Sequence, residues 1–145
     1  MSELKIVLVD DNESFRTAMK SLLVEQYNAS IIGEASNADE FWKIKNFNHA
    51  DVILMDVMMP NVNGIELTRK ILWQYRLMKI IAITMHVDKI YLTTLIEAGF
   101  VGCIFKDDLV KSLKATIDAV LKGGRSFPGN IQIDQKRTAM EEEGQ

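Results

Sequence analysis

The stretch LKIVLVDD, residues 4–11, is the part of the sequence that decides the fold. An apolar run rich in β-branched residues ends abruptly in two consecutive acids, Asp10 and Asp11. The same pattern returns at VILMD, residues 52–56, where Asp56 follows a second apolar run. Runs of this length and composition are typical of buried strands, so the sequence predicts two strands that each end in carboxylates.

Three further apolar runs repeat the pattern along the chain, and longer segments of helical period separate the runs. Alternating strands and helices are the signature of an α/β fold with a parallel sheet and helices on both faces. The carboxyl ends of such strands gather along one edge, where ligands bind, so we expect the functional site there. The five predicted strands are Leu4 to Val9, Ser30 to Ala35, Val52 to Met55, Ile80 to Ile83 and Val101 to Phe105.

The predicted helices follow from apolar positions spaced three and four residues apart. The first is marked by five such positions between Phe15 and Leu23. Trp42 and Trp73 are expected to be partly buried on the second and third helices. The later helices are expected over Ala38 to Phe47, after the turn Pro60 to Gly64, from an Asp88 cap to Gly99, and over Leu109 to Leu121 before Gly123-Gly124.

The bulk composition is that of one globular domain, with 145 residues of which 48% are hydrophobic and 26% charged. Seventeen basic and twenty acidic side chains give a net charge of -3, which provides no general electrostatic footprint for nucleic acid or an anionic membrane. No run approaches membrane-spanning length, and the N-terminal apolar run is too short for a signal peptide. The single Cys103 cannot form an internal disulfide, so we expect a reducing compartment, the cytoplasm.

The chain changes character after the fifth predicted helix. From Arg125 onward, a breaker segment is followed by a polar, charged stretch without a periodic apolar face. We therefore expect one domain over residues 1–124 and a linker-like or disordered tail over residues 125–145, without an output domain.

The ends of four predicted strands carry groups that belong together chemically. Asp10, Asp11 and Asp56 supply carboxylates, Thr84 a hydroxyl and Lys106 an ammonium. A lone acid pair is usually a helix cap or a loop feature, but clustered carboxylates need a cation, and hard oxygen ligands suit Mg²⁺ better than zinc. Phosphoryl transfer to a carboxylate requires such a set, because metal and donors cancel the charge of the moving group. The sequence therefore predicts that chemistry at this edge.

From Leu4 to Gly124 the sequence closely resembles the receiver domain of bacterial two-component response regulators. The resemblance implies a flavodoxin-like, doubly wound, five-stranded parallel sheet in the order 2-1-3-4-5, flanked by five helices. The pair Lys106-Asp107 resembles the subgroup found on helix-turn-helix regulators of the NarL/LuxR type. The motifs that carry the resemblance are KIVLVDD at residues 5–11, DVMMP at residues 56–60, Gly64, Thr84 and Lys106.

The resemblance also implies a role for each site residue. Asp56 is the implied phosphoacceptor. The implied Mg²⁺ site consists of Asp11, Asp56 and the backbone carbonyl of Met58, with Asp10 acting through water, and the implied ligands of the phosphoryl oxygens are Thr84 and Lys106.

The implied function is a signalling switch rather than an enzyme in the usual sense, because such a domain catalyses only its own phosphorylation and dephosphorylation. The implied phosphodonor is a sensor histidine kinase or a phosphotransfer protein. A downstream partner would bind the face formed by the fourth helix, fifth strand and fifth helix, and a homodimer is one possible assembly. The resemblance links the domain to transcription regulation, although we expect this chain by itself to bind neither nucleic acid nor membrane.

Two positions depart from the family pattern. The position that normally carries an aromatic switch residue, three before Lys106, holds Cys103, and Phe105 is expected to face the other side of the strand. Another element than an aromatic at this position must therefore report the switch. Met85 follows Thr84, where many receivers have a small residue. We therefore expect Met85 to hinder the access of small phosphodonors and water to Asp56.

Three alternatives compete with this interpretation. A hydrolase with an aspartyl nucleophile, of the haloacid dehalogenase type, needs a second acid where Met58 stands. A receiver that has lost phosphorylation would be a protein-binding module, but the complete acidic set argues against it. A DNA-binding regulator needs a helix-turn-helix, and none is recognisable after Gly124.

His49 and His86 lack the spacing of metal ligands and are expected to be surface residues.

Overall fold

A five-stranded parallel sheet forms the centre of the computed structural model, which describes residues 3–59, 63–85 and 89–128. The strands are β1 (Lys5–Val9), β2 (Ser30–Ala35), β3 (Val52–Asp56), β4 (Ile80–Thr84) and β5 (Gly102–Phe105). Their order is β2-β1-β3-β4-β5 and every neighbouring pair is parallel, as predicted. The helices are α1 (Glu13–Tyr27), α2 (Ala38–Trp42), α3 (Gly64–Gln74), α4 (Lys89–Ala98) and α5 (Leu109–Leu121), with short 3-10 helices η1 (Phe47–His49) and η2 (Lys106–Asp108).

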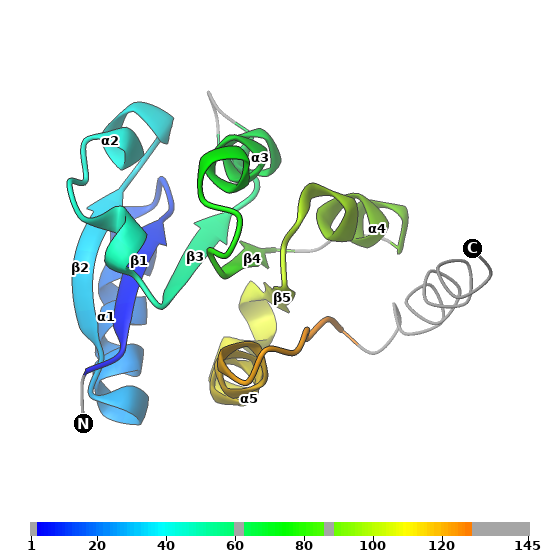
Figure 1. The fold of residues 1–145 in the computed structure, drawn as a ribbon. Coiled ribbons are helices and arrows are strands. Elements are labelled where there is room, and N and C mark those ends of the chain that lie inside the picture. The colour runs from blue at the N-terminus through cyan, green and yellow to red at the C-terminus, as the bar shows by residue number, and fades with distance from the viewer. Residues whose placement is uncertain (1–2, 60–62, 86–88, 129–145) are drawn as a thin grey trace.

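Helices cover both faces of the sheet (Figure 1). Helices α2, α3 and α4 lie on one face, and α1 and α5 lie on the other. Alternation along the strands produces two cores, because Ile6 and Leu8 pack with α1 and α5, whereas Val7 and Val9 point to the opposite side. The sheet is therefore buried on both sides, as the continuous apolar runs predict.

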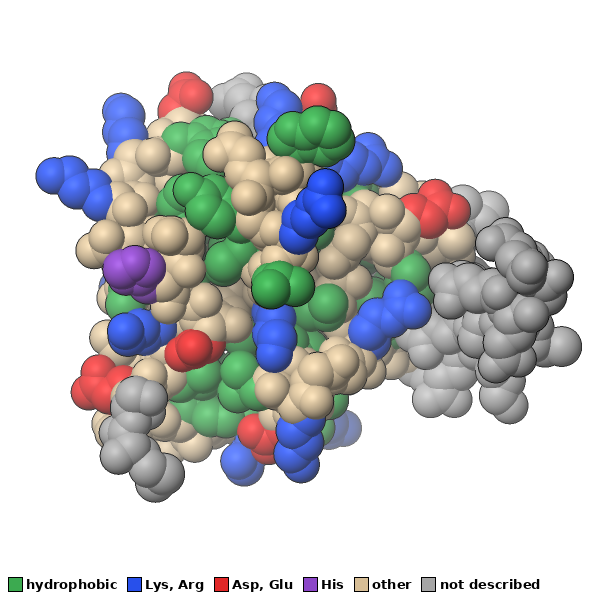
Figure 2. All heavy atoms as spheres, viewed as in Figure 1, with side chains coloured by type: hydrophobic (Ala, Val, Ile, Leu, Met, Phe, Trp, Pro, Cys, Tyr) green, Lys and Arg blue, Asp and Glu red, His purple; other side chains and the backbone are tan. Residues whose placement is uncertain are grey.

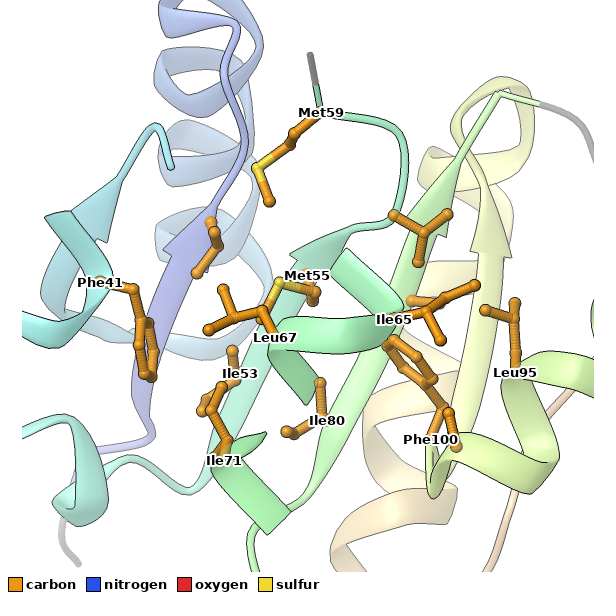
Figure 3. Close-up of a cluster of buried hydrophobic side chains, with 14 of the residues drawn as sticks. Phe41, Ile53, Met55, Met59, Ile65, Leu67, Ile71, Ile80, Leu95 and Phe100 are labelled. Atoms are coloured by element: carbon orange, nitrogen blue, oxygen red, sulfur yellow. The ribbon is translucent and has the colours of Figure 1, made fainter. Parts of the chain in front are cut away.

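The larger core fills the space beneath α3 (Figure 3). Leu67 and Ile71 of α3 point from the helix toward the strands, where Ile53 and Met55 of β3 lie. These side chains are at most 1% exposed. Close packing at the centre of the sheet fixes β3, and β3 ends in Asp56.

Helix ends follow the capping signals in the sequence. The Asn12 side chain accepts a hydrogen bond from the Phe15 amide at 2.9 Å and starts α1. Helix α4 ends before Gly99 and α5 before Gly123, and both glycines have positive φ values, 105° and 92°. These two stops are confirmed, whereas the Asp88 cap lies outside the described residues.

The second helix is shorter than predicted. Its α-helical part stops at Trp42, and the amides of Lys43 and Ile44 bond to carbonyls only three residues back. The chain then turns so that Phe47 packs against Phe41, with ring centroids 4.7 Å apart. The aromatic contact places Phe47 in η1, and a continuous helix to that residue was the wrong prediction.

Hydrophobic side chains lie among charged ones on the face shown in Figure 2. Trp73 is 85% exposed, so the expectation that it is partly buried was wrong. Its helix buries Leu67 and Ile71, and Trp73 lies two residues beyond Ile71, about 200° around the helix from it. Trp42 is 37% exposed and packs against Phe41 and Phe47, so part of its surface is buried, as expected. In the described ranges, no helix has the length and apolar character needed to cross a membrane.

The chain returns to the sheet after α5. The Ser126 amide donates to the Val101 carbonyl, and the Cys103 amide donates to the Ser126 carbonyl, both at 3.0 Å. Ser126 thereby forms a parallel bridge beside Gly102, and Phe127 packs against the larger core. Residues 125–128, which we call the C-terminal strap, thus pair with β5 beyond the boundary expected at residue 124.

The fifth strand places Cys103 and Phe105 on the same side. Both pack with the larger core, whereas Ile104 belongs to the smaller one. The expectation that Phe105 faces away from Cys103 was wrong, because residues two apart on a strand share a face. Phe105 is also the register partner of Thr84 across β4 and β5.

Candidate functional site

Three carboxylates meet at the carboxyl edge of the sheet. Asp10 and Asp11 follow β1, Asp56 ends the neighbouring β3, and one carboxylate oxygen from each lies within 4.8 Å of the others. Asp10 and Asp56 are buried and Asp11 is exposed. The predicted acidic cluster therefore exists, with two of its acids inside the protein and one open to solvent.

A single ammonium group neutralises part of this charge. Lys106, directly after β5, places Nζ 3.0 Å from Asp10 Oδ2 and 4.0 Å from Asp56 Oδ2. The same Nζ lies 4.2 Å from the centre of the Phe15 ring, a cation-π distance. The ammonium is held on one side by α1 and on the other by the acids.

Backbone amides orient the two buried acids. Asp10 Oδ1 accepts a hydrogen bond from the Asn12 amide at 2.9 Å, and Asp56 Oδ1 accepts one from the Met58 amide at 3.0 Å. Among the described residues no group is directed as a hydrogen-bond donor to Asp10 Oδ2, although Lys106 lies within ion-pair distance. Each buried acid therefore uses one carboxylate oxygen to fix its orientation. Asp10 Oδ2 remains available to coordinate a metal ion or a water bound to one.

Burial changes the protonation of Asp56. Desolvation is the main cause that raises its pKa from 3.8 to about 6, and the charges of Asp10 and Asp11 add to the rise. The Met58 amide and the Lys106 ammonium act in the opposite direction. Near neutral pH this carboxylate is ionised in a place where its negative charge is poorly solvated, which favours binding of a cation.

Thr84 completes the edge as the last residue of β4. Its side chain is fully buried, and within the described part of the chain its Oγ1 has no hydrogen-bond partner. A buried hydroxyl without a partner is unfavourable by about 1–3 kcal/mol. The hydroxyl is therefore a donor available to an anionic group at this edge.

The loop after β3 approaches the site closely. A Cβ atom on Gly64 would lie 2.2 Å from the Asp56 carbonyl oxygen, so only glycine fits at the start of α3. The Met58 and Met85 side chains are 65% and 59% exposed. Exposure of these side chains does not test metal binding by the Met58 carbonyl or hindrance of small phosphodonors by Met85. Both stay predictions.

The donor set fits a hard divalent cation. All three clustered side chains offer carboxylate oxygens, which Mg²⁺ prefers. Cys103 is buried on β5, and its pKa is raised to about 12 by desolvation, so it stays a thiol. His49 is exposed in η1, as predicted, and His86 lies outside the described residues.

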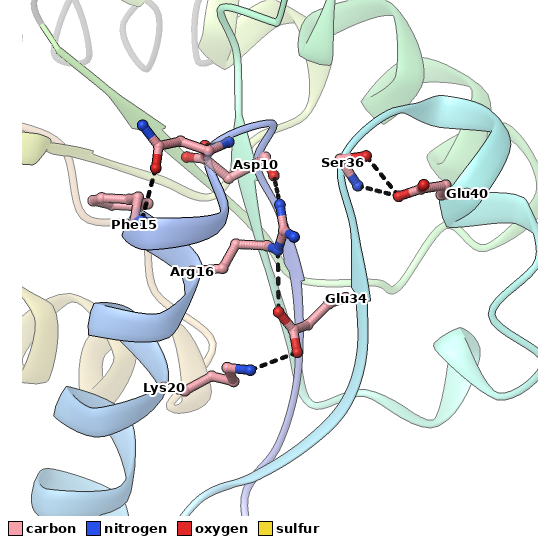
Figure 4. A network of polar contacts seen from close by, with 8 residues as sticks. Asp10, Phe15, Arg16, Lys20, Glu34, Ser36 and Glu40 are labelled. Carbon is pink, nitrogen blue, oxygen red and sulfur yellow. Dashed lines mark hydrogen bonds and ion pairs between the residues drawn. The ribbon is translucent and has the colours of Figure 1, made fainter.

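The sequence reasoning missed residues that hold the acidic turn. Arg16 of α1 donates to the Asp10 carbonyl and to Glu34 of β2, and Lys20 binds the same glutamate (Figure 4). The available signal was an acid inside a strand together with two cations four residues apart on the preceding helix. Such a pattern predicts an ion pair but does not reveal the Asp10 contact.

Comparison with known families gives one extended match. The model of the response regulator receiver domain matches residues 6–118. The chain is 30% identical over 140 residues to the response regulator UvrY of Escherichia coli (strain K12), covering 97% of this chain and 64% of UvrY. It is 28% identical over 123 residues to the transcriptional regulatory protein DegU of Brevibacillus brevis, covering 85% and 52%. The chain thus spans about half to two thirds of the length of these relatives.

Solved structures show the same fold. A LuxR-family two-component response regulator from Aurantimonas sp. SI85-9A1 superposes with a TM-score of 0.83 at 29% identity, covering 94% of this chain and 99% of that one. The isolated REC domain of RcsB from Salmonella enterica serovar Typhimurium, in the presence of phosphomimetic BeF3-, gives a TM-score of 0.80 at 19% identity, covering 90% and 97%. The second likeness concerns the fold alone.

Proposed function

The chain belongs to the response regulator receiver domain family, with relatives of the NarL/LuxR type as the sequence suggested, and we propose that it is a phosphorylation-dependent switch with Asp56 as phosphoacceptor. The observation that carries the proposal is the convergence of Asp10, Asp11 and Asp56 with Lys106 at one edge of the sheet. The family is not one of conventional enzymes, and the domain acts on itself.

The proposed transfer uses a carboxylate oxygen of Asp56 as the nucleophile. This oxygen forms a bond to the donor's phosphorus while the bond from phosphorus to the leaving group breaks, and the leaving group keeps that electron pair. Mg²⁺ bound by Asp11, Asp56, the Met58 carbonyl and, through water, Asp10 would neutralise charge on the phosphoryl oxygens. Lys106 and Thr84 supply an ammonium and a hydroxyl to those oxygens.

The orphaned Thr84 hydroxyl supports a switching step. A phosphoryl group on Asp56 supplies the acceptor that this hydroxyl lacks among the described residues. Movement of Thr84 would pass to its register partner Phe105 and so to β5. We propose that partner binding at the face of α4, β5 and α5 changes in this way, with Phe105 taking the place of an aromatic at Cys103.

The proposed partners follow from the chemistry of the transfer. The donor is a histidine kinase or phosphotransfer protein, and a second copy of the chain is one candidate for the output face. Because DegU is named a transcriptional regulatory protein, we propose that the switch serves transcription control. We place it in the cytoplasm, since Cys103 is a free thiol.

Intact-protein mass spectrometry after incubation with acetyl phosphate or phosphoramidate tests this proposal. We expect one phosphoryl adduct that requires both Mg²⁺ and Asp56. Asp56→Asn should abolish the adduct, whereas Asp39→Asn, which removes an exposed acid at the start of α2, should retain it. If small donors and a kinase both leave the wild type unmodified, the proposal is wrong; labelling only by the kinase would support hindrance at Met85.

A further inference from the structure

Arg16 connects three elements beside the acidic cluster (Figure 4). From α1, its Nη1 donates to the Asp10 carbonyl at 2.5 Å, and its Nε donates to Glu34 Oε1 of β2 at 3.1 Å. The Arg16 side chain is only 14% exposed. A guanidinium used in two directions at once is well suited to fix geometry, because its donors lie in one rigid plane.

The contact restrains the backbone that carries two of the acids. The Asp10 amide donates to the Ala35 carbonyl of β2 at 3.0 Å, and the Asp10 carbonyl receives Arg16. Both backbone polar groups of Asp10 are therefore bonded. Asp11 follows in the same turn and is exposed, so the position of its carboxylate depends on this backbone.

Glu34 keeps Arg16 in place. Its Oε1 accepts from Arg16, and its Oε2 accepts from Lys20 Nζ at 2.8 Å. The hydrogen bond from Lys20 is the largest cause that lowers the Glu34 pKa; burial opposes it and the bond from Arg16 adds to it. The glutamate therefore stays ionised and binds both cations, of which only Arg16 reaches Asp10.

We propose that Arg16, held by Glu34, is a positioning residue that sets the Asp10-Asp11 turn for binding of a divalent cation. This inference rests on the proposed function, because it assigns Arg16 to the same acidic cluster. Arg16 itself contacts neither the cation nor the phosphoryl group in this assignment. Its effect passes through the Asp10 backbone.

Positioning and charge predict opposite effects of removing Arg16 on Mg²⁺ affinity. Arg16 is a cation beside the cluster, so its removal would by charge alone strengthen Mg²⁺ binding. If positioning dominates, removal weakens Mg²⁺ binding, because the two carboxylates lose their fixed separation. The direction of the change therefore separates the two effects.

The test compares four variants of the full chain by isothermal titration with Mg²⁺. We expect Arg16→Gln to weaken Mg²⁺ binding roughly threefold to tenfold, and Glu34→Gln to weaken it less, because glutamine still offers an oxygen to Arg16. Arg16→Lys should weaken it partly, since one ammonium cannot reproduce the planar fork. Lys20→Gln is the matched control and should stay within about twofold of the wild type, since Lys20 binds Glu34 without touching Asp10.

A second readout separates positioning from general damage to the fold. Phosphoryl adduct formation by Arg16→Gln should be slow at low Mg²⁺ and return to near the wild-type rate at saturating Mg²⁺, with circular dichroism unchanged. Unchanged or tighter Mg²⁺ binding in both Arg16→Gln and Arg16→Lys would overturn the inference. If the wild type neither binds Mg²⁺ nor forms the phosphoryl adduct, the proposed function is wrong, and the inference fails with it.

Discussion

The ammonium of Lys106 pairs with Asp10, at 3.0 Å from Oδ2, rather than with the phosphoacceptor candidate Asp56, whose Oδ2 lies 4.0 Å away. In this state the Lys106 ammonium neutralises Asp10, an acid that would also support the metal ion. Addition of a phosphoryl group to Asp56 would bring a stronger anion within its reach. We therefore propose that the ion pair with Asp10 is a resting position, and that Lys106 would move from it toward a phosphoryl group on Asp56.

Lys106→Met should tighten Mg²⁺ binding to the unphosphorylated domain. Removal of the ammonium eliminates repulsion between two cations at a partly buried site, and we expect a gain of roughly threefold to tenfold in affinity. Titration calorimetry at neutral pH measures this change. Lys111→Met, which removes an exposed charge on α5, is the control and should leave the affinity within about twofold. Weaker Mg²⁺ binding in Lys106→Met would mean that the ammonium organises the acids rather than competing with the metal ion.

Asp56→Asn should stabilise the metal-free domain in a pH-dependent way. The pKa of Asp56 is about 6 in the folded state and near 3.8 unfolded, so the folded state retains a proton that the unfolded state releases between these values. Wild-type stability therefore falls as pH rises from about 4 to about 6, and the loss is complete above that range. A shift of this size corresponds to about 2–3 kcal/mol. We expect the advantage of the variant to be small at pH 4 and largest at pH 7.

Urea unfolding at several pH values without Mg²⁺ checks this prediction. Asp39→Asn carries the same change at an exposed position of α2 and should alter the free energy of unfolding by less than about 0.5 kcal/mol. An Asp56→Asn advantage that is constant from pH 4 to pH 7 would contradict a raised pKa as its cause. Mg²⁺ should reduce the advantage, because the metal ion stabilises the ionised wild type.

The fold was predictable because each strand is a short apolar run that stops at a polar residue. Parallel pairing and the gathering of Asp10 and Asp56 at one edge follow from that pattern, whereas the strand order came from the resemblance to receiver domains. The contacts that hold the acidic turn in place were harder to predict from the sequence. Arg16 and Glu34 are ordinary charged residues in the sequence, and their link to the Asp10 backbone appears only when β2 lies beside β1.

Gly64→Ala should damage the site more than its small size suggests. The added methyl would lie 2.2 Å from the Asp56 carbonyl oxygen and 2.9 Å from the Val57 Cα, so the start of α3 must move away from β3. We expect a loss of roughly 1–3 kcal/mol in unfolding free energy and slower adduct formation. Gly124→Ala is the control, since its first contact would be the Ala119 carbonyl oxygen at 3.2 Å, far along the chain from the acids. Equal effects of the two substitutions on adduct formation would argue against a special role of the Gly64 approach.

The C-terminal strap, residues 125–128, had no sequence signal beyond its breaker residues. Ser126 forms two backbone hydrogen bonds, one with Val101 just before β5 and one with Cys103 in β5, and Phe127 packs against the larger core. A segment of four residues has no periodicity from which pairing can be predicted. The strap can pair there because β5 is the edge strand of the sheet and has β4 on one side only.

Phe127→Ala should loosen this strap and expose Cys103 to thiol reagents. Cys103 is 4% exposed and its pKa is raised to about 12, so in the closed state it reacts slowly at neutral pH. Loss of the Phe127 contact removes roughly 1–2 kcal/mol of packing and lets the Ser126 bridge open more often. We expect at least a fivefold faster adduct of N-ethylmaleimide, followed by intact mass, at pH 7. Because Cys103 is the only cysteine of the chain, each adduct reports this one site.

Arg125→Ala is the matched control for the strap, since this exposed residue precedes the bridge and packs little. It should label at close to the wild-type rate. Labelling must be followed well below the unfolding transition, because global unfolding exposes Cys103 in every variant. If Phe127→Ala labels at the wild-type rate while its unfolding free energy falls, Phe127 stabilises the domain without shielding β5. If it labels faster under conditions in which global unfolding is too rare to explain the rate, the strap opens as a local unit, and the edge of β5 becomes available for pairing whenever the strap is open.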